Sequence, residues 1–127
     1  MSPTQLSKLE AVMRIVLTFY EAFNQHDGDS LLKLLSDDCI IEDISPAPEG
    51  TIYKGKVAIS LFWEKIFRES PQAHFEIEEI FGLGARCVVR WSYNSLSTDG
   101  RKTHFRGADI FKVTNGLICE QLSYVKC

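Results

Sequence analysis

The sequence predicts one α+β domain, in which three helices near the N-terminus pack on a strongly curved, mostly antiparallel sheet. Apolar residues spaced by three and four positions, the period of a helix, all lie before residue 70. From residue 73 on, runs rich in β-branched and aromatic residues alternate with short turns. Helices segregated to one face of such a sheet define an α+β domain. Because only three helices cover a long, twisted sheet, we expect a cone that encloses a cavity.

Composition restricts the classes of function. The 127 residues fit a single domain over residues 1–127, and the net charge of -3 without a basic patch argues against nucleic-acid binding. No apolar run approaches the ~20 residues of a membrane span, and the start lacks the pattern of a signal peptide. The four cysteines, at positions 39, 87, 119 and 127, lack metal-ligand spacing. We therefore expect reduced cysteines, no metal and a cytoplasmic location.

Three segments carry helical patterns. Residues 5–25 have a wide apolar stripe, which the segment 24–28 ends. Asp27 or Asp29 can cap a short second helix that runs to about Leu35. A third helix is predicted over residues 56–69, ended by Ser70-Pro71.

Six segments carry strand patterns. A first strand is expected over residues 39–44 and a short edge strand over 51–54, joined by a proline-containing loop over 45–50. Longer strands follow over residues 73–82, 86–97 and 103–113. Asn115-Gly116 predicts a tight hairpin into the last strand, since both residues tolerate positive φ. We expect the loop over 45–50 to border the mouth of the cavity.

Alternation along the strands places an acid in the interior. Residues 103–113 divide into a mainly aromatic face that contains Asp109 and a basic face that suits solvent or a subunit boundary. The preceding strand would direct Trp91 and Tyr93 to the same interior. A carboxyl group among aromatic side chains must be hydrogen-bonded or protonated, so Asp109 should have a raised pKa.

Two runs resemble a known superfamily. Residues 23–43 resemble the start of nuclear transport factor 2-like proteins, with Phe-Asn at 23–24, Asp27, Asp29, Leu31 and the run Ser-Asp-Asp-Cys-Ile-Ile-Glu-Asp at 36–43. Residues 101–111, with Asn115-Gly116 and Ser123-Tyr124-Val125, resemble the SnoaL-like and ketosteroid isomerase branch. The resemblance implies a cystatin-like cone. It also implies cofactor-independent acid/base chemistry on an apolar carbonyl-containing substrate, of the isomerase or polyketide cyclase type.

The resemblance also implies roles for individual residues. The ketosteroid isomerase general base falls on Asp43, and its protonated hydrogen-bond donor falls on Asp109. The family's tyrosine falls on Phe19, which is a departure, and Tyr20 lies about 100° further round the helix. The expected substrate-binding residues are Phe19, Tyr20, Trp63, Trp91, Tyr93, Phe105 and Phe111. The resemblance further implies a homodimer through the outer sheet face, at Ala108, Ile110, Leu122 and Tyr124.

Other functions stay open at this point. The same cavity could hold an apolar small molecule without catalysis, or the domain could be a dimeric interaction module with a collapsed cavity. An epoxide hydrolase needs an Arg-x-Asp motif, whereas Arg106 and Asp109 have a different spacing. A scytalone-type dehydratase needs inward histidines, and His104 should face outward.

Overall fold

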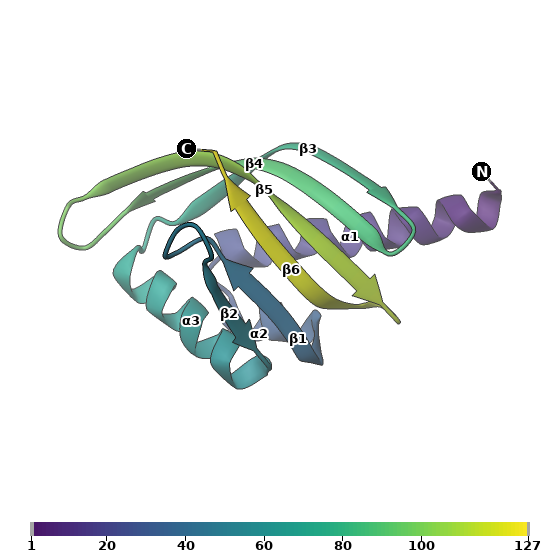
Figure 1. Cartoon of the computed structure of the whole chain (residues 1–127), viewed down its shortest axis with the longest axis horizontal. Coiled ribbons are helices and arrows are strands. Elements are labelled where there is room, and N and C mark those ends of the chain that lie inside the picture. The colour runs from purple at the N-terminus through teal and green to yellow at the C-terminus, as the bar shows by residue number, and fades with distance from the viewer. Residues whose placement is uncertain (1, 127) are drawn as a thin grey trace.

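The computed structural model describes residues 2–126. Three helices and six strands follow one another in the predicted order (Figure 1). The helices are α1 (Pro3–Asn24), α2 (Gly28–Lys33) and α3 (Lys56–Glu69). The strands are β1 (Leu35–Asp43), β2 (Thr51–Lys54), β3 (His74–Leu83), β4 (Arg86–Leu96), β5 (Lys102–Thr114) and β6 (Leu117–Val125).

The six strands form one sheet in the order β2-β1-β6-β5-β4-β3. All neighbours are antiparallel except β1 and β6, which are parallel. The hairpin between β5 and β6 turns at Asn115 and Gly116, with φ of 53° and 78°, which confirms the turn predicted from this dipeptide. The sheet is therefore mostly antiparallel, and its last strand lies at the centre beside the first.

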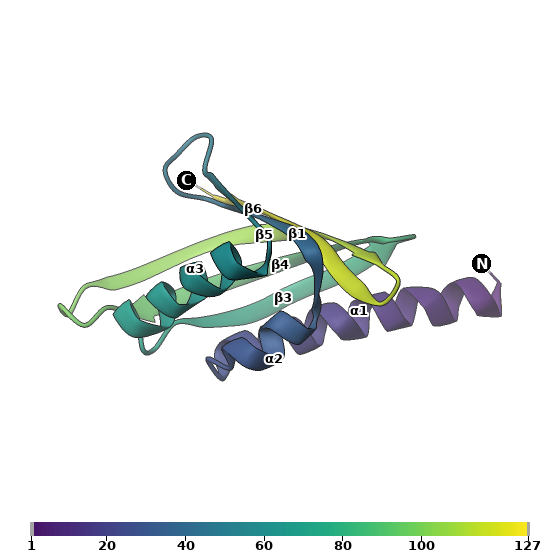
Figure 2. The ribbon, with the colours of Figure 1, turned by 90° about the horizontal axis from the view of Figure 1, so that it is seen from below.

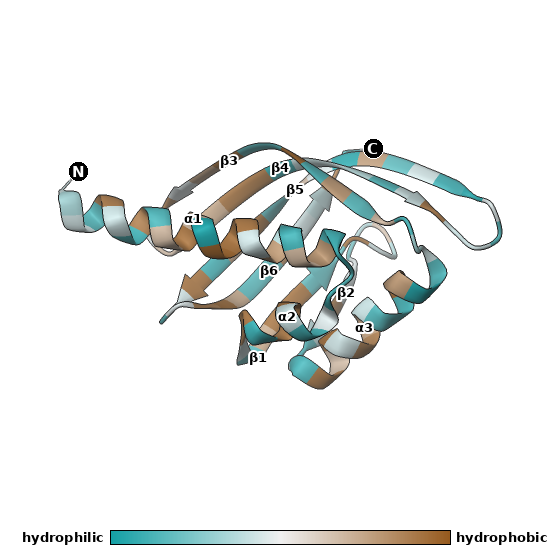
Figure 3. Cartoon of the chain, turned by 180° about the vertical axis from the view of Figure 1, so that it is seen from behind, coloured by the Kyte–Doolittle hydropathy of each residue, from teal (hydrophilic) through white to brown (hydrophobic). Residues whose placement is uncertain are grey.

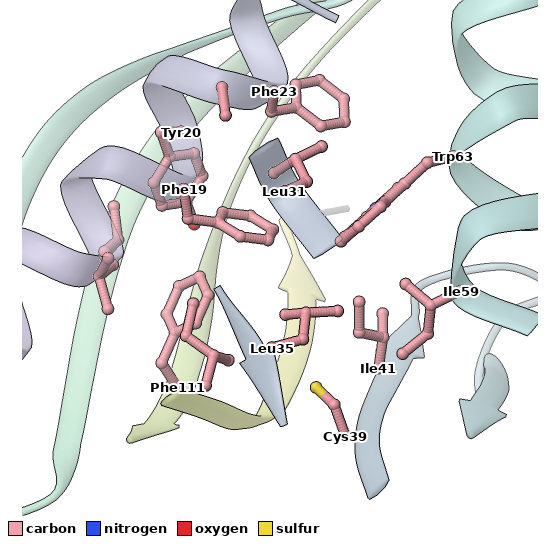
Figure 4. Packing of buried hydrophobic residues seen from close by; sticks show 14 of the residues in the cluster. Phe19, Tyr20, Phe23, Leu31, Leu35, Cys39, Ile41, Ile59, Trp63 and Phe111 are labelled. Atoms are coloured by element: carbon pink, nitrogen blue, oxygen red, sulfur yellow. The ribbon is translucent and has the colours of Figure 1, made fainter. Parts of the chain in front are cut away.

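The three helices lie on one side of the curved sheet (Figure 2). Helix α1 runs along the sheet and contacts β3, whereas α3 lies over β1 and β2. Hydrophobic residues recur along the helices (Figure 3), and those of α1 and α3 that are buried, among them Val16, Phe19, Ile59 and Trp63, belong to the core. One continuous core fills the space between them, with Phe19 and Tyr20 of α1 beside Phe111 of β5, and Trp63 on α3 (Figure 4). These layers confirm the α+β class.

Local hydrogen bonds explain where the first two helices begin. Ser2 caps α1 through a reciprocal capping box with Gln5, and the Asp27 side chain accepts from the backbone N–H of Ser30 at the start of α2. Helix α2 ends at Lys33, two residues before the predicted end, because the chain joins the sheet there. The backbone N–H of Ile118 donates to the carbonyl of Leu34, and Leu35 pairs with Ile118. The first strand therefore starts four residues earlier than predicted.

The outer face of the sheet is polar at its centre. Arg90 pairs with Glu79, and Arg106 pairs with Glu78, with all four side chains open to solvent. These pairs agree with the basic outer face predicted for β5. Among residues 2–126, no helix is long and apolar enough to cross a membrane. The cysteines at 39, 87 and 119 are free thiols, and Cys127 lies outside the described residues.

Candidate active site

A cavity of about 250 Å³ lies between the inner face of the sheet, α1 and α3. Its walls are mostly aromatic and aliphatic, and its polar groups come from the end of β1 and the loop that follows, from β4 and from β6. The lining residues are Phe19, Phe23, Ile41, Asp43, Ile44, Ser45, Phe62, Trp63, Ile66, Phe75, Trp91, Tyr93, Phe105, Gln121 and Ser123. The predicted cavity is therefore present, and no Lys, Arg or His contributes to its lining.

Six of the nine predicted site residues line this cavity: Asp43, Phe19, Trp63, Trp91, Tyr93 and Phe105. They come from α1, β1, α3, β4 and β5, so the fold brings together side chains far apart in the sequence. Tyr93 and Phe105 are cross-strand partners whose rings stack with centroids 5.0 Å apart. Apolar walls with a few polar groups are typical of a small-molecule site.

Three predicted residues do not line the cavity: Tyr20, Asp109 and Phe111. Asp109 and Phe111 lie on the inner face of β5, as alternation predicts, since both are fully buried. Alternation does not predict the position along the strand at which the cavity ends. The C-terminal half of α1 packs against this part of β5, where Phe19 and Tyr20 both contact the Phe111 ring edge-on. The prediction that Asp109 and Phe111 face the cavity is therefore wrong.

Asp109 instead anchors a buried hydrogen-bond network beneath the cavity. Its Oδ2 accepts from the Tyr20 hydroxyl and from the Gln121 side-chain amide at 3.0 Å, and its Oδ1 accepts from the Ser123 hydroxyl at 2.6 Å. Gln121 and Ser123 also line the cavity. The network thus connects the cavity floor to an acid that the cavity does not reach.

Burial raises the pKa of Asp109, and the donated hydrogen bonds oppose this shift. The pKa of Asp109 is thus raised, as predicted from the sequence. The charge of Asp43 does not contribute to this shift. Within the described part of the chain, the indole Nε1 of Trp91 is the one buried side-chain nitrogen or oxygen without a hydrogen-bond partner. The Trp91 indole N–H still lies close enough to Asp109 to favour the charged form of its carboxyl group, which partly lowers the pKa of Asp109. Arg90, on the neighbouring strand, lies on the outer face with Glu79 and is not among the groups that shift the pKa of Asp109.

Asp43 is the acid that the cavity does contain. It is the last residue of β1, two positions after the buried Ile41, and alternation therefore directs both side chains inward. Burial raises its pKa, and the backbone N–H groups of Ile44 and Ser45 partly oppose the shift. The Tyr93 hydroxyl also has a raised pKa, through burial and through the nearby negative charge of Asp43. Asp43 and Tyr93 therefore share one desolvated environment.

The loop over 45–50 borders the cavity through its first residue, Ser45, as predicted. Gly50 closes this loop with φ of +74°, and its backbone N–H donates to the carbonyl of Pro46 at 2.7 Å. A Cβ atom at position 50 would collide with the carbonyl oxygen of Asp43. The glycine thus allows the loop to fold back against the end of β1.

Gln121 and Ser123 are polar lining residues that were not predicted from the sequence. The apolar lining residues that were not predicted are Phe23, Ile41, Ile44, Phe62, Ile66 and Phe75. The sequence predicts an outer face for the last strand through Leu122 and Tyr124. The same alternation places Gln121 and Ser123 on the inner face, so the signal was present. Polar residues on the inner face of a central strand are unusual enough to have indicated a polar cavity floor.

The histidines stay away from the cavity. His104 is exposed and contacts the Asn94 side chain, as the outward assignment predicted. His26 adopts a positive φ of 54° in the turn after α1, and its Nε2 contacts the carbonyl of Ala73. Over residues 2–126, no group of three or more His, Cys, Asp or Glu side chains is placed to hold a metal ion.

Comparisons with known proteins agree with this architecture. A family model for the SnoaL-like domain matches residues 16–121. An NTF2-like protein of unknown function from Mesorhizobium loti has a similar structure, with 33% sequence identity, 94% of each chain covered and a TM-score of 0.79. No curated protein matches the chain.

Two more distant structures show the same fold. A SnoaL-like protein from Shewanella denitrificans, described as a candidate polyketide cyclase, has a TM-score of 0.81 at 19% identity. The alignment covers 91% of this chain and 90% of that chain. An epoxide hydrolase from M. tuberculosis, of the LEH-like type, has a TM-score of 0.81 at 18% identity and covers 93% of this chain and 84% of its own.

Proposed function

Because the chain belongs to the SnoaL-like domain family within the NTF2-like proteins, we propose that it is an acid/base enzyme acting on a small, apolar carbonyl compound. The reaction would be of the ketosteroid isomerase or SnoaL-like cyclase type and would need no cofactor. One observation carries the proposal: Asp43, whose pKa is raised by burial, lines a cavity whose walls are otherwise mainly aromatic and aliphatic.

In this proposal Asp43 is the general base. It removes a proton from the carbon next to the substrate carbonyl, and the negative charge moves to the carbonyl oxygen. A raised pKa brings a carboxylate nearer to the pH at which it works, which improves proton transfer. The apolar walls exclude water from the reacting carbon.

The developing enolate oxygen needs a hydrogen-bond donor, and Asp109 is too deep to supply it directly. Tyr93 is the best-placed substitute, because it lines the cavity and its pKa reflects the charge of Asp43. Its raised pKa also means that the hydroxyl keeps its proton and remains a donor. A donor aimed at the developing charge contributes about 3–4 kcal/mol in well-studied enzymes.

Binding without catalysis is the second candidate, and one observation favours it. Only one of the two predicted acids faces the cavity, and a binding protein requires no pair of acids. An interaction module with a collapsed cavity finds no such support, since the cavity is open.

An assay of hydrogen exchange at carbon distinguishes the acid/base enzyme from the binding protein. Small cyclic ketones incubated with the protein in D₂O should exchange the hydrogen next to the carbonyl, as followed by NMR. Asp43→Asn should lower the exchange rate by about 10²–10⁴-fold, the usual contribution of a general base. Asp38→Asn, on the exposed part of the same strand, is the matched control and should exchange normally. Binding of the ketones without exchange would favour the binding protein.

A further inference from the structure

We infer that the cavity selects an uncharged compound of about one ring in size that donates a hydrogen bond to the side-chain carbonyl of Gln121. This inference rests on the proposed function in two respects, namely that the ligand binds in the cavity of Asp43 and that Asp43 must stay free to act as the base. The size of the cavity, the charges around it and the orientation of one amide support it.

The size of the cavity limits the ligand. Sites for drug-sized molecules have volumes of about 300–1,000 Å³. The cavity here is smaller, at about 250 Å³, and rings that pack edge-on against their neighbours surround it. A single substituted ring fits such a volume, whereas a fused four-ring compound would extend beyond it.

The charges around the cavity exclude anions. Asp43 lines the cavity and Asp109 lies beneath its floor, while no cationic side chain contributes to the lining. An anionic ligand would be desolvated without a partner, which is strongly unfavourable. A cationic ligand would pair with Asp43 and leave no free base. The substrate is therefore uncharged.

The orientation of Gln121 determines what the floor accepts. Its amide N–H donates to Asp109 at 3.0 Å, and this bond forms whether or not Asp109 carries a proton. The amide nitrogen is thereby fixed toward the acid, and the amide oxygen points away from it. Among the described residues that oxygen makes no hydrogen bond, yet it is not sealed from solvent space.

Asp109 is thus a positioning residue for the floor of the cavity. Gln121 is only 7% exposed, so its unpaired carbonyl must be satisfied by water or by a ligand that carries O–H or N–H. A ligand with only acceptors, such as a simple ketone, would leave this carbonyl unsatisfied and should bind more weakly than a ketone that also carries a hydroxyl group. Ser123 can serve as either donor or acceptor, depending on the proton of Asp109, and therefore does not decide the preference.

Three ring compounds of similar shape test the inference: phenol, anisole and benzoate. Their dissociation constants would be measured by NMR titration, following the side-chain signals of Trp91 and Tyr93, which line the cavity and are present in every variant tested. Phenol should bind about tenfold more tightly than anisole, since leaving a buried acceptor unpaired costs about 1–3 kcal/mol. Benzoate should bind more weakly than phenol by at least as large a factor. Equal affinities for phenol and anisole, tight benzoate binding, or no binding in the cavity would each overturn the inference.

Variants locate the cause of the preference. Gln121→Met should abolish the preference for phenol over anisole, whereas Glu120→Met, on the outer face of β6 beside Arg86, should keep it. Asp109→Leu should weaken the preference by freeing the amide, and Asp109→Asn should largely restore it because its oxygen still accepts from Gln121. Circular dichroism checks that each variant folds, and a preference unchanged in folded Gln121→Met would refute the inference.

Failure of this inference and failure of the proposed function are distinguishable. All titrations use binding alone and can be repeated with Asp43→Asn, which lacks the base. If that variant keeps the phenol preference while the normal protein shows no hydrogen exchange, the inference stands and the enzyme proposal fails.

Discussion

The hydroxyl of Tyr20 donates a hydrogen bond to the carboxyl group of Asp109, 89 residues further along the chain. Both side chains are almost completely buried, at 1% exposure each. The bond joins the last turns of α1 to the centre of the sheet. It also explains why a tyrosine stands beside Phe19 on the helix: Phe19 faces the cavity, and Tyr20 faces the acid beneath it.

Removing this donor should destabilise the protein. Tyr20→Phe leaves Asp109 buried with one partner fewer and should lower the free energy of unfolding by about 1–3 kcal/mol, as expected for a buried polar group that loses a partner. Urea unfolding monitored by circular dichroism measures the change. Tyr124→Phe is the control. The Tyr124 side chain is 54% exposed, so the loss of its hydroxyl should have little effect on the free energy of unfolding. A Tyr20→Phe variant as stable as the normal protein would show that the bond contributes nothing.

Stability should depend on pH through Asp109. Because its pKa is raised in the folded state, the folded protein holds this proton more tightly than the unfolded chain. The contribution to stability is therefore present below the ordinary Asp pKa of about 3.9 and is lost as pH rises through the raised value. Unfolding free energies measured across pH should fall more steeply above about pH 4 in the normal protein than in Asp109→Asn. Parallel curves would contradict a raised pKa.

Gly107 should be needed for the packing of Trp91. A Cβ atom at position 107 would lie 2.7 Å from Cη2 of the Trp91 ring and would also collide with the backbone oxygen of Tyr124. Gly107→Ala should destabilise the protein by about 1–3 kcal/mol, the usual cost of overpacking, and should change Trp91 fluorescence. Gly28→Ala is the control: nothing lies within 4 Å of its added Cβ. If both variants unfold at the same urea concentration, the close packing is not required.

We propose that the outer face of the sheet forms a homodimer. Tyr124 is exposed and Ile110 and Leu122 are half-buried on this face, next to the ion pairs of Arg90 and Arg106. A two-fold dimer is the commonest closed assembly. Analytical ultracentrifugation at micromolar concentration should find a dimer, and Leu122→Glu should convert it to a monomer. Leu83→Glu, at an exposed hairpin end, should leave the dimer intact. A normal protein that is monomeric would exclude this interface.

The sequence was sufficient for the elements but not for the depth of the cavity. Helix α3 and strand β2 begin and end where their patterns predicted, because apolar spacing and glycine or proline punctuation are local signals. Asp109 shows the limit of such signals. Alternation gives its face, but only the packing of α1 against β5 determines whether that face meets open space or the Phe19 and Tyr20 rings.

Asp43, unlike Asp109, does line the cavity. Glu42 and Asp43 face opposite ways on a short strand, and alternation alone does not determine which of the two faces the interior. The structure resolves this through neighbours distant in sequence, because β1 pairs with β6 through Ile41 and Gln121. Long-range pairing, which no local pattern encodes, thus decides which acid enters the cavity.

The parallel pairing of β1 with β6 has a consequence for the order of folding. It joins residues about 80 positions apart, as between Ile41 and Gln121, and contacts so distant in sequence are slow to form. Because Gln121 and Ser123 belong to β6, the floor of the cavity cannot exist before the final strand inserts between β1 and β5. A ligand that binds this floor therefore recognises only chains in which β6 is in place, and its binding can serve as a kinetic probe of the insertion of this strand.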